Sequence, residues 1–229
     1  MNFEVTHPAG FSKLDVNFQQ DEVLYAQPKS MLCMSTGFDI TAHVGGAAGP
    51  GSLLGGVKSM LSGESFATAK YRAKRDGVWI SVAPTAIGEV RIIELSGGPG
   101  IYLTKGAYLA HQEGVILTPK FSGFKGLMAK KGIFLLHASG KGSLCISSFG
   151  AIVERNLVED EVLVVDNDYV LTFSDTLEYE LRAATKSITH SLMSGEGLVN
   201  RYKGPGQILY QTRSRQRGGL ISSIINLST

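Results

Sequence analysis

The 229-residue chain has little net charge, few cysteines and no long apolar run. Its 22 basic and 20 acidic residues nearly cancel, so no overall field attracts nucleic acid or anionic lipid. No apolar stretch approaches the roughly 18 residues of a membrane-spanning helix. The start of the chain lacks the basic patch and apolar run of an export signal. We therefore expect a cytoplasmic protein that binds no DNA and is not an integral membrane protein.

The chain has only two cysteines, Cys33 and Cys145, and each lies in an apolar alternating segment. A pair of thiols is too few for a disulfide framework and suits a reducing compartment. Free cysteines are among the residues most often buried. The pattern therefore predicts two buried, reduced packing thiols, although a single disulfide between them stays open at this level.

Glycines punctuate short segments of valine, isoleucine, leucine, tyrosine and phenylalanine along the whole chain. Apolar and polar residues alternate in residues 177–182, and again in residues 78–82, as a half-buried strand requires. Helical spacing occurs only at residues 53–61, where Gly55 and Gly56 interrupt it. The sequence predicts an all-β fold with at most one or two short helices.

Strand-like motifs recur along the chain at nearly constant intervals. One set consists of Asp21-Glu22-Val23-Leu24, Ile101-Tyr102-Leu103 and Asp160-Glu161-Val162-Leu163, and the same shifts superpose Met31-Leu32, Tyr108-Leu109 and Val170-Leu171. A second set predicts equivalent strands at residues 78–82, 144–148 and 208–212. The two sets alternate, which predicts three repeats of approximately residues 1–80, 81–146 and 147–229.

Three repeats with half-apolar sheets must pack those faces together or against another chain to escape water. We therefore expect one compact body of β-sandwich units in a pseudo-threefold arrangement. Sheet edges at the ends of such a body need covering. This predicts a homo-oligomer, with a trimer as the first expectation.

Short motifs distributed over nearly the whole chain carry a family resemblance: Gly55-Gly56 followed by Ser62-Gly63-Glu64-Ser65, Gly106-Ala107-Tyr108-Leu109-Ala110, Ser194-Gly195-Glu196-Gly197, and Gly204-Pro205-Gly206 followed by Gln211-Thr212-Arg213. In their order and spacing the chain resembles the bacterial and archaeal relatives of the mitochondrial "altered inheritance of mitochondria" protein twenty-four. The resemblance implies repeated β-sandwich units similar to those of the tryptophan-responsive RNA-binding attenuation protein, and a tendency to form oligomers. It implies no reaction. The mitochondrial relative is associated with inner-membrane organisation, which does not transfer to a chain without a transit peptide.

No recognised catalytic or metal-binding motif is present. The five histidines His7, His43, His111, His137 and His190 are dispersed and show no paired ligand spacing, so we expect no metal and no cofactor. Gly51 and Gly56 have the separation of a phosphate-binding loop, but Val57 stands where that loop needs its lysine. Ser65 and Cys145 lie in no nucleophile signature.

Two matching Ser-Gly-Glu motifs, which contain Gly63 with Glu64 and Gly195 with Glu196, are the strongest candidates for chemistry. Paired carboxylates can act as acid and base, which leaves an uncharacterised hydrolase as a third hypothesis. We favour a structural role, in which each glycine forms a turn and each glutamate accepts backbone N–H groups there.

Near the end of the chain Arg213, Arg215 and Arg217 alternate with polar residues and can face a phosphate from one side of a strand. Without interleaved aromatic residues a solvated face explains them better. Gln211 and Arg213 join the two Ser-Gly-Glu motifs as candidate structural or interaction residues. The favoured function is a non-catalytic oligomeric scaffold or binding module, and the alternative is an RNA- or small-ligand-binding protein by analogy of fold.

Overall fold

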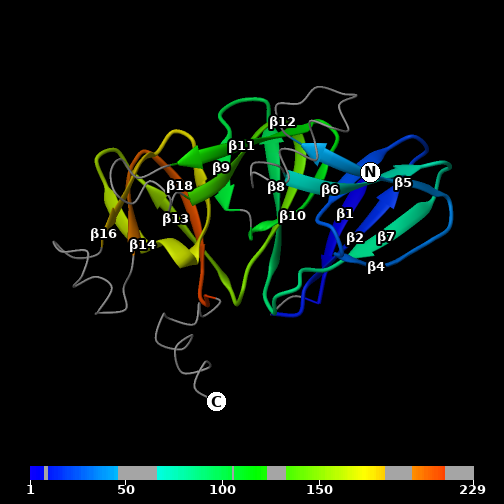
Figure 1. Ribbon diagram of the computed structural model, residues 1–229, viewed down its shortest axis with the longest axis horizontal. Helices are drawn as coiled ribbons and strands as arrows, with labels where there is room; N and C mark the ends of the chain where they lie inside the picture. The colour runs from blue at the N-terminus through cyan, green and yellow to red at the C-terminus, as the bar shows by residue number, and fades with distance from the viewer. Residues whose placement is uncertain (8–9, 46–65, 105, 123–132, 184–197, 215–229) are drawn as a thin grey trace, which may run out of the picture.

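The computed structural model describes residues 1–7, 10–45, 66–104, 106–122, 133–183 and 198–214, and nearly all of its regular structure is β (Figure 1). The first group of strands comprises β1 (Asn2–Thr6), β2 (Lys13–Phe18), β3 (Val23–Ala26), β4 (Met31–Met34), β5 (Phe38–Gly45), β6 (Phe66–Ala73) and β7 (Val78–Val82). The second comprises β8 (Val90–Ser96), β9 (Ile101–Thr104), β10 (Tyr108–Gln112), β11 (Val115–Ser122) and the long β12 (Ile133–Ser147). The third comprises β13 (Ile152–Leu157), β14 (Val162–Asp166), β15 (Val170–Ser174), β16 (Glu178–Ala183), β17 (Leu198–Lys203) and β18 (Gly206–Gln211).

The all-β prediction is confirmed. Among the described residues a short 3-10 turn, Asn167–Tyr169, precedes β15. The helix expected at residues 53–61 lies outside the described residues. In the part of the chain that is described, no helix is long and apolar enough to cross a membrane.

Every strand pairing between named strands is antiparallel, and the same pairing pattern occurs in each group. The central strand β7 lies between β2 and β4, the second half of β12 between β8 and β10, and β18 between β13 and β15. These central strands contain the segments expected at residues 78–82, 144–148 and 208–212, apart from Ser148 and Thr212. The recurrence concerns strand pairing alone, and the internal repeat, its threefold arrangement and its boundaries stay predictions.

A shift of register occurs at the same place in each group. Against the central strand, the shift falls between Met31 and Cys33 in β4, between Tyr108 and Ala110 in β10, and between Val170 and Thr172 in β15. An extra residue at such a bulge increases the local twist and directs the strand away from its partner. The bulge therefore marks corresponding residues in β4, β10 and β15.

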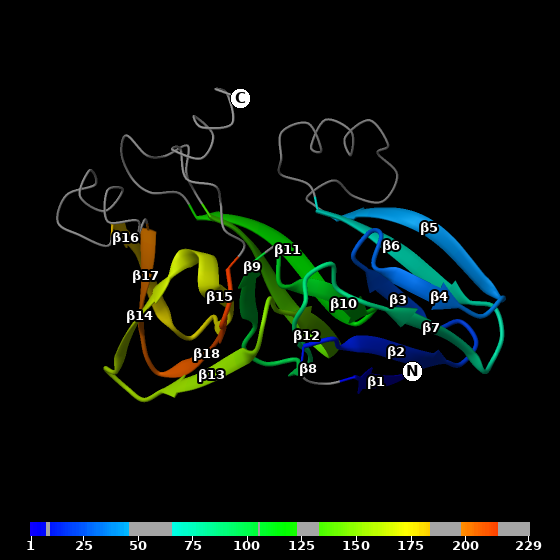
Figure 2. The same ribbon diagram turned by 90° about the horizontal axis from the view of Figure 1, so that it is seen from below.

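The groups follow one another along the longest axis, with the first group at one end and the third at the other (Figures 1 and 2). Each group has a buried apolar cluster, because alternating strands turn one set of side chains inward. In β7, for example, Val78, Ile80 and Val82 are buried while Trp79 is exposed, as the alternation predicts. Neighbouring groups share an 11-stranded sheet, whereas β4 and β14 lie in the two smaller sheets at the ends.

Candidate interaction edges

Two junctions join the three strand groups, and each is an antiparallel pairing of strands from neighbouring groups. At the first junction β3 pairs with β10, so that Ala26 faces Ala110 and Tyr25 faces His111. The rings of Tyr25 and His111 stack, with centroids 4.9 Å apart. This pairing extends the sheet of β5, β6 and β3 directly into that of β10, β12 and β8.

The second junction has the same construction. Strand β9 pairs with β15, so that Leu103 faces Thr172 and Tyr102 faces Phe173. The Tyr102 and Phe173 rings stack with centroids 5.2 Å apart, in the place that Tyr25 and His111 occupy at the first junction. A cross-strand ring pair thus supports the shared sheet at both junctions.

The same construction leaves β4 open. In the described structure β4 pairs with β7 alone, whereas its counterparts β10 and β15 are each flanked on both sides. The consequence is visible in burial: the first four residues of β10 and of β15 are buried, whereas Met31, Leu32 and Cys33 of β4 are exposed. Leu32 is 57% exposed, while the corresponding Leu109 and Leu171 are almost completely buried.

A further open edge among the described strands belongs to β14, the counterpart of β3 and β9. Within the described residues β14 pairs with β17 alone, and Val164 is 56% exposed. Strands β4 and β14 lie at opposite ends of the molecule in both views (Figures 1 and 2). Short edge strands that expose apolar side chains and backbone hydrogen-bonding groups are sites at which another chain can add. The two ends therefore present complementary halves of the junction that occurs twice inside the chain.

The open edge corrects one sequence prediction. Both cysteines are free, but only Cys145 is a buried packing thiol, and Cys33 is exposed. The apolar, alternating sequence around Cys33 correctly indicates a strand, but among the described residues no strand lies on the outer side of β4 to bury it. Burial raises the pKa of the Cys145 thiol far above its usual value, which suppresses its reactive thiolate form.

In protein whose β4 edge is not covered by another chain, we expect a thiol reagent such as Ellman's reagent to titrate one cysteine in the native state and two in the denatured state. The Cys33→Ser variant should lose the native signal, because Cys145 is buried. Absorbance at 412 nm gives the count. Two equivalents from native protein, or one from native Cys33→Ser, would contradict this assignment.

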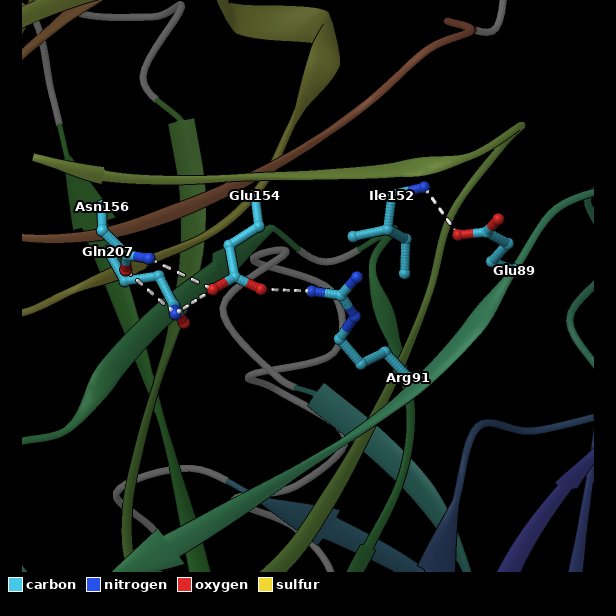
Figure 3. A network of polar contacts seen from close by, with 6 residues as sticks. All are labelled: Glu89, Arg91, Ile152, Glu154, Asn156 and Gln207. Atoms are coloured by element: carbon cyan, nitrogen blue, oxygen red, sulfur yellow. Dashed lines mark hydrogen bonds and ion pairs between the residues drawn. The ribbon is translucent and has the colours of Figure 1, made fainter.

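Many polar side chains of the described structure pair with one another, and the described residues form no recognisable catalytic arrangement. The clearest network joins β8 of the second group to β13 and β18 of the third (Figure 3). Arg91 Nη1 lies 2.8 Å from a Glu154 oxygen, and Gln207 Nε2 donates to the other Glu154 oxygen at 2.8 Å. Glu89 accepts the Ile152 amide at 2.8 Å. Each carboxylate thus has a structural partner, and the network holds two strand groups in register.

The described histidines and acidic residues form no metal site, since no group of three or more His, Cys, Asp or Glu side chains converges among them. His137 Nε2 lies 3.1 Å from Asp175 Oδ2, and the same carboxylate oxygen accepts the Gly100 amide at 2.7 Å. Asp175 therefore supports the turn before β9. A small hollow between Phe173, Tyr179, Tyr202 and Asn200 is too narrow to admit a water molecule.

The comparisons with known proteins agree with this fold. The model of the family described as mitochondrial biogenesis AIM24 matches residues 3–213. The chain belongs to the AIM24 family. It is similar to an uncharacterized protein of Streptococcus pyogenes serotype M6, at 27% identity over 216 residues that cover 93% of this chain and 86% of that protein. No specific activity is assigned to the relatives compared here.

A solved structure shares the AIM24 fold over its whole length. The X-ray crystal structure of protein SPYM3_0169 from Streptococcus pyogenes matches with a TM-score of 0.79 at 24% identity, and the match covers 100% of this chain and 99% of that one. At this identity the likeness shows the fold alone. The arrangement of strand groups described above is therefore shared with a protein of low sequence similarity.

Two AIM24 motifs that the sequence singled out have structural explanations. Gly106-Ala107-Tyr108-Leu109-Ala110 contains the bulge of β10, where Tyr108 donates from its hydroxyl to the Tyr25 carbonyl across the first junction at 3.0 Å. Gln211 accepts the Phe149 amide at 2.8 Å and donates to the Asp168 carbonyl at 3.1 Å. Gln211 thus connects the end of β18 to two loops.

Of the remaining candidates from the sequence, only Arg213 lies among the described residues. Arg213 is exposed beyond β18, and its amide donates to the Phe149 carbonyl. Gly63, Glu64, Gly195 and Glu196 lie outside the described residues, as do Arg215 and Arg217. The sequence did not reveal the open edges β4 and β14. Their signal was present in the superposed motifs, which place Met31-Leu32 of β4 over residues that are buried in β10 and β15.

Proposed function

We propose that this AIM24-family protein is a non-catalytic homo-oligomeric β scaffold whose copies associate through the open edges β4 and β14. The supporting observation is the exposure of β4, a strand whose two counterparts are buried between neighbours. A trimer is the first stoichiometry to test. The free thiols of Cys33 and Cys145 support a reducing compartment such as the cytoplasm.

Association is favoured because it removes apolar side chains from water at both edges. Each buried square ångström of apolar surface contributes about 25 cal/mol. The exposed residues at the edges are Met31, Leu32, Val162 and Val164. Added backbone hydrogen bonds along the joined strands satisfy groups that otherwise face solvent and specify an antiparallel partner.

We expect the wild-type protein to sediment as an oligomer at micromolar concentration and Leu32→Lys to sediment as a monomer of 24.5 kDa. A lysine at this position places a charge in a joined sheet, which costs several kcal/mol of association free energy unless it is paired. Analytical ultracentrifugation measures both masses. Ile87→Lys is the matched control, because Ile87 is 60% exposed and lies on no sheet edge, so it should leave the oligomer intact.

The result also separates the alternative functions. A wild-type monomer would refute the scaffold. An absorbance ratio at 260 to 280 nm that is raised in the purified protein, and that falls after nuclease treatment, would favour the RNA-binding alternative. Oligomers that survive Leu32→Lys would remove β4 from the association surface.

A further inference from the structure

We infer that β14 of one copy pairs antiparallel with β4 of the next, with Val165 facing Cys33, so that copies join head to tail. This inference rests on the proposed homo-oligomer and specifies which strands meet, in which direction and in which register. The partner is a second copy of this chain, because each of its ends supplies one half of a junction that the chain already forms twice.

Composition of the joined sheet supports the choice of strands. The first junction joins β5, β6 and β3 to β10, β12 and β8, and the second joins β11, β12 and β9 to β15, β18 and β13. The strands left over are β16, β17 and β14 at one end and β4, β7, β2 and β1 at the other. Pairing β14 with β4 of another copy therefore builds a third sheet of the same kind.

The register follows from the position of the bulge. At the first junction Ala26 faces Ala110, the residue after the bulge of β10. At the second junction Leu103 faces Thr172, the residue after the bulge of β15. Ala26 stands five residues before Met31, where the bulge of β4 begins, and Leu103 stands five residues before Tyr108, where the bulge of β10 begins. In the third group the residue five before Val170 is Val165. Because Cys33 follows the bulge of β4 as Ala110 follows that of β10, Val165 faces Cys33 and Val164 faces Met34.

The backbone hydrogen bonds at the first junction specify the geometry of this pair. The Gln27 amide donates to the Leu109 carbonyl at 2.7 Å, and such a bond flanks a pair that exchanges no hydrogen bonds itself. Ala26 and Ala110 are that pair. Cα atoms in such pairs lie about 4.5 Å apart, within the range that a disulfide spans. The corresponding Val165 and Cys33 should therefore be linkable by a disulfide after a single substitution.

The direct test is the Val165→Cys variant, oxidised with copper phenanthroline and examined by non-reducing electrophoresis. We expect most of the chain to shift to covalent multimers that dithiothreitol reverses, because one thiol on each end meets its partner in the next copy. Cys33→Ser in the same background should abolish the shift. Val164→Cys with native Cys33 should give at most a minor shift, because neighbouring residues of a strand point to opposite faces.

A mixing experiment tests direction without relying on a new thiol. In this register the amides of Val164 and Met34 point toward the partner copy, since pairs alternate along an antiparallel ladder. Proline at either position removes that amide while the intramolecular ladder keeps its own bonds. We expect Val164→Pro and Met34→Pro to be monomers when separate and to form a dimer when mixed, because the mixture contains one intact edge of each kind.

The outcomes distinguish this inference from the proposed function. A wild-type monomer refutes both. A wild-type oligomer in which Val165→Cys does not link to Cys33, or in which either proline variant alone still dimerises, leaves the scaffold standing and overturns the head-to-tail pairing. Self-dimerisation of one proline variant would instead indicate that like edges meet.

Discussion

Replacing Phe173 with alanine should lower the free energy of unfolding by about 3–5 kcal/mol, which is a large part of the 5–15 kcal/mol typical of a folded domain. Phe173 is 2% exposed and contacts the rings of Tyr102, Tyr179 and Tyr202. It belongs both to the core of the third strand group and to the junction with the second. The truncation therefore creates a cavity and removes the ring pair that supports a shared sheet.

The measurement is chemical denaturation of wild-type and variant protein at one fixed concentration, because association contributes to the apparent stability of an oligomer. Phe11→Ala is the matched control. Phe11 is 75% exposed, so the same change of side chain should alter stability by no more than about 0.5 kcal/mol. If both variants lowered the free energy of unfolding equally, the Phe173 contacts at the junction would contribute no more to stability than an ordinary surface contact.

Sequence patterns were sufficient for the fold class because strand alternation is a local property. The alternation of Val78, Ile80 and Val82 with polar or exposed neighbours follows from the geometry of a single strand, and it survives in β7. The superposed motifs predicted no bulge, but they align the residues Met31, Tyr108 and Val170, each of which begins one. These features depend on residues close together in the chain or on matching short segments.

Burial at the ends of the molecule could not be predicted in the same way. Met31-Leu32 is as apolar as Val170-Leu171, yet the first pair is exposed and the second is buried. This difference in burial depends on whether a strand from the preceding group lies beside the pair. The composition of the pair itself does not show whether such a neighbour is present. The misassigned Cys33 has the same cause, because in the part of the chain that the structure describes no strand covers the outer edge of β4.

His111 illustrates a signal that single-residue reasoning overlooks. A dispersed histidine on a strand is ordinarily a surface residue, but His111 is only 6% exposed. The superposition of Tyr108-Leu109 on Val170-Leu171 places His111 over Phe173, a core aromatic residue at the next junction. A polar, titratable ring therefore occupies a position that the fold uses for aromatic stacking, and this makes the first junction sensitive to pH.

The expected result is a loss of stability at low pH that belongs to His111. Burial, with a smaller contribution from the charge of His43, lowers the pKa of His111 from its ordinary value near 6.5 to about 3. The folded protein therefore favours the neutral ring. The contribution of neutral His111 to the free energy of unfolding is fully present above pH 6.5 and is lost as the pH falls toward 3. Between pH 7 and pH 3 this loss is on the order of 4 kcal/mol.

The surroundings of the ring explain why protonation is unfavourable. His111 Nδ1 lies 2.7 Å from the Tyr108 hydroxyl, and the His111 ring stacks on Tyr25. The His43 ring also packs against Tyr25, with ring centroids 5.1 Å apart. Lys70 Nζ adds a positive charge 5.6 Å from the Tyr25 ring. A protonated His111 would lie near basic side chains and apolar groups, and none of these contacts is a carboxylate.

The variant that isolates this effect is His111→Phe, because Phe173 shows that a phenylalanine ring fits the corresponding place at the second junction. Tyr108 keeps its hydrogen bond to the Tyr25 carbonyl in this variant. Urea unfolding of both proteins from pH 7.5 to pH 3.5 gives the difference in stability at each pH, in which carboxylates common to both cancel. Below pH 6.5 the free energy of unfolding of His111→Phe should rise steadily relative to that of the wild type. A difference that stays constant over the whole range would mean that the folded protein admits a charged His111, and that the ring is not held neutral at the junction.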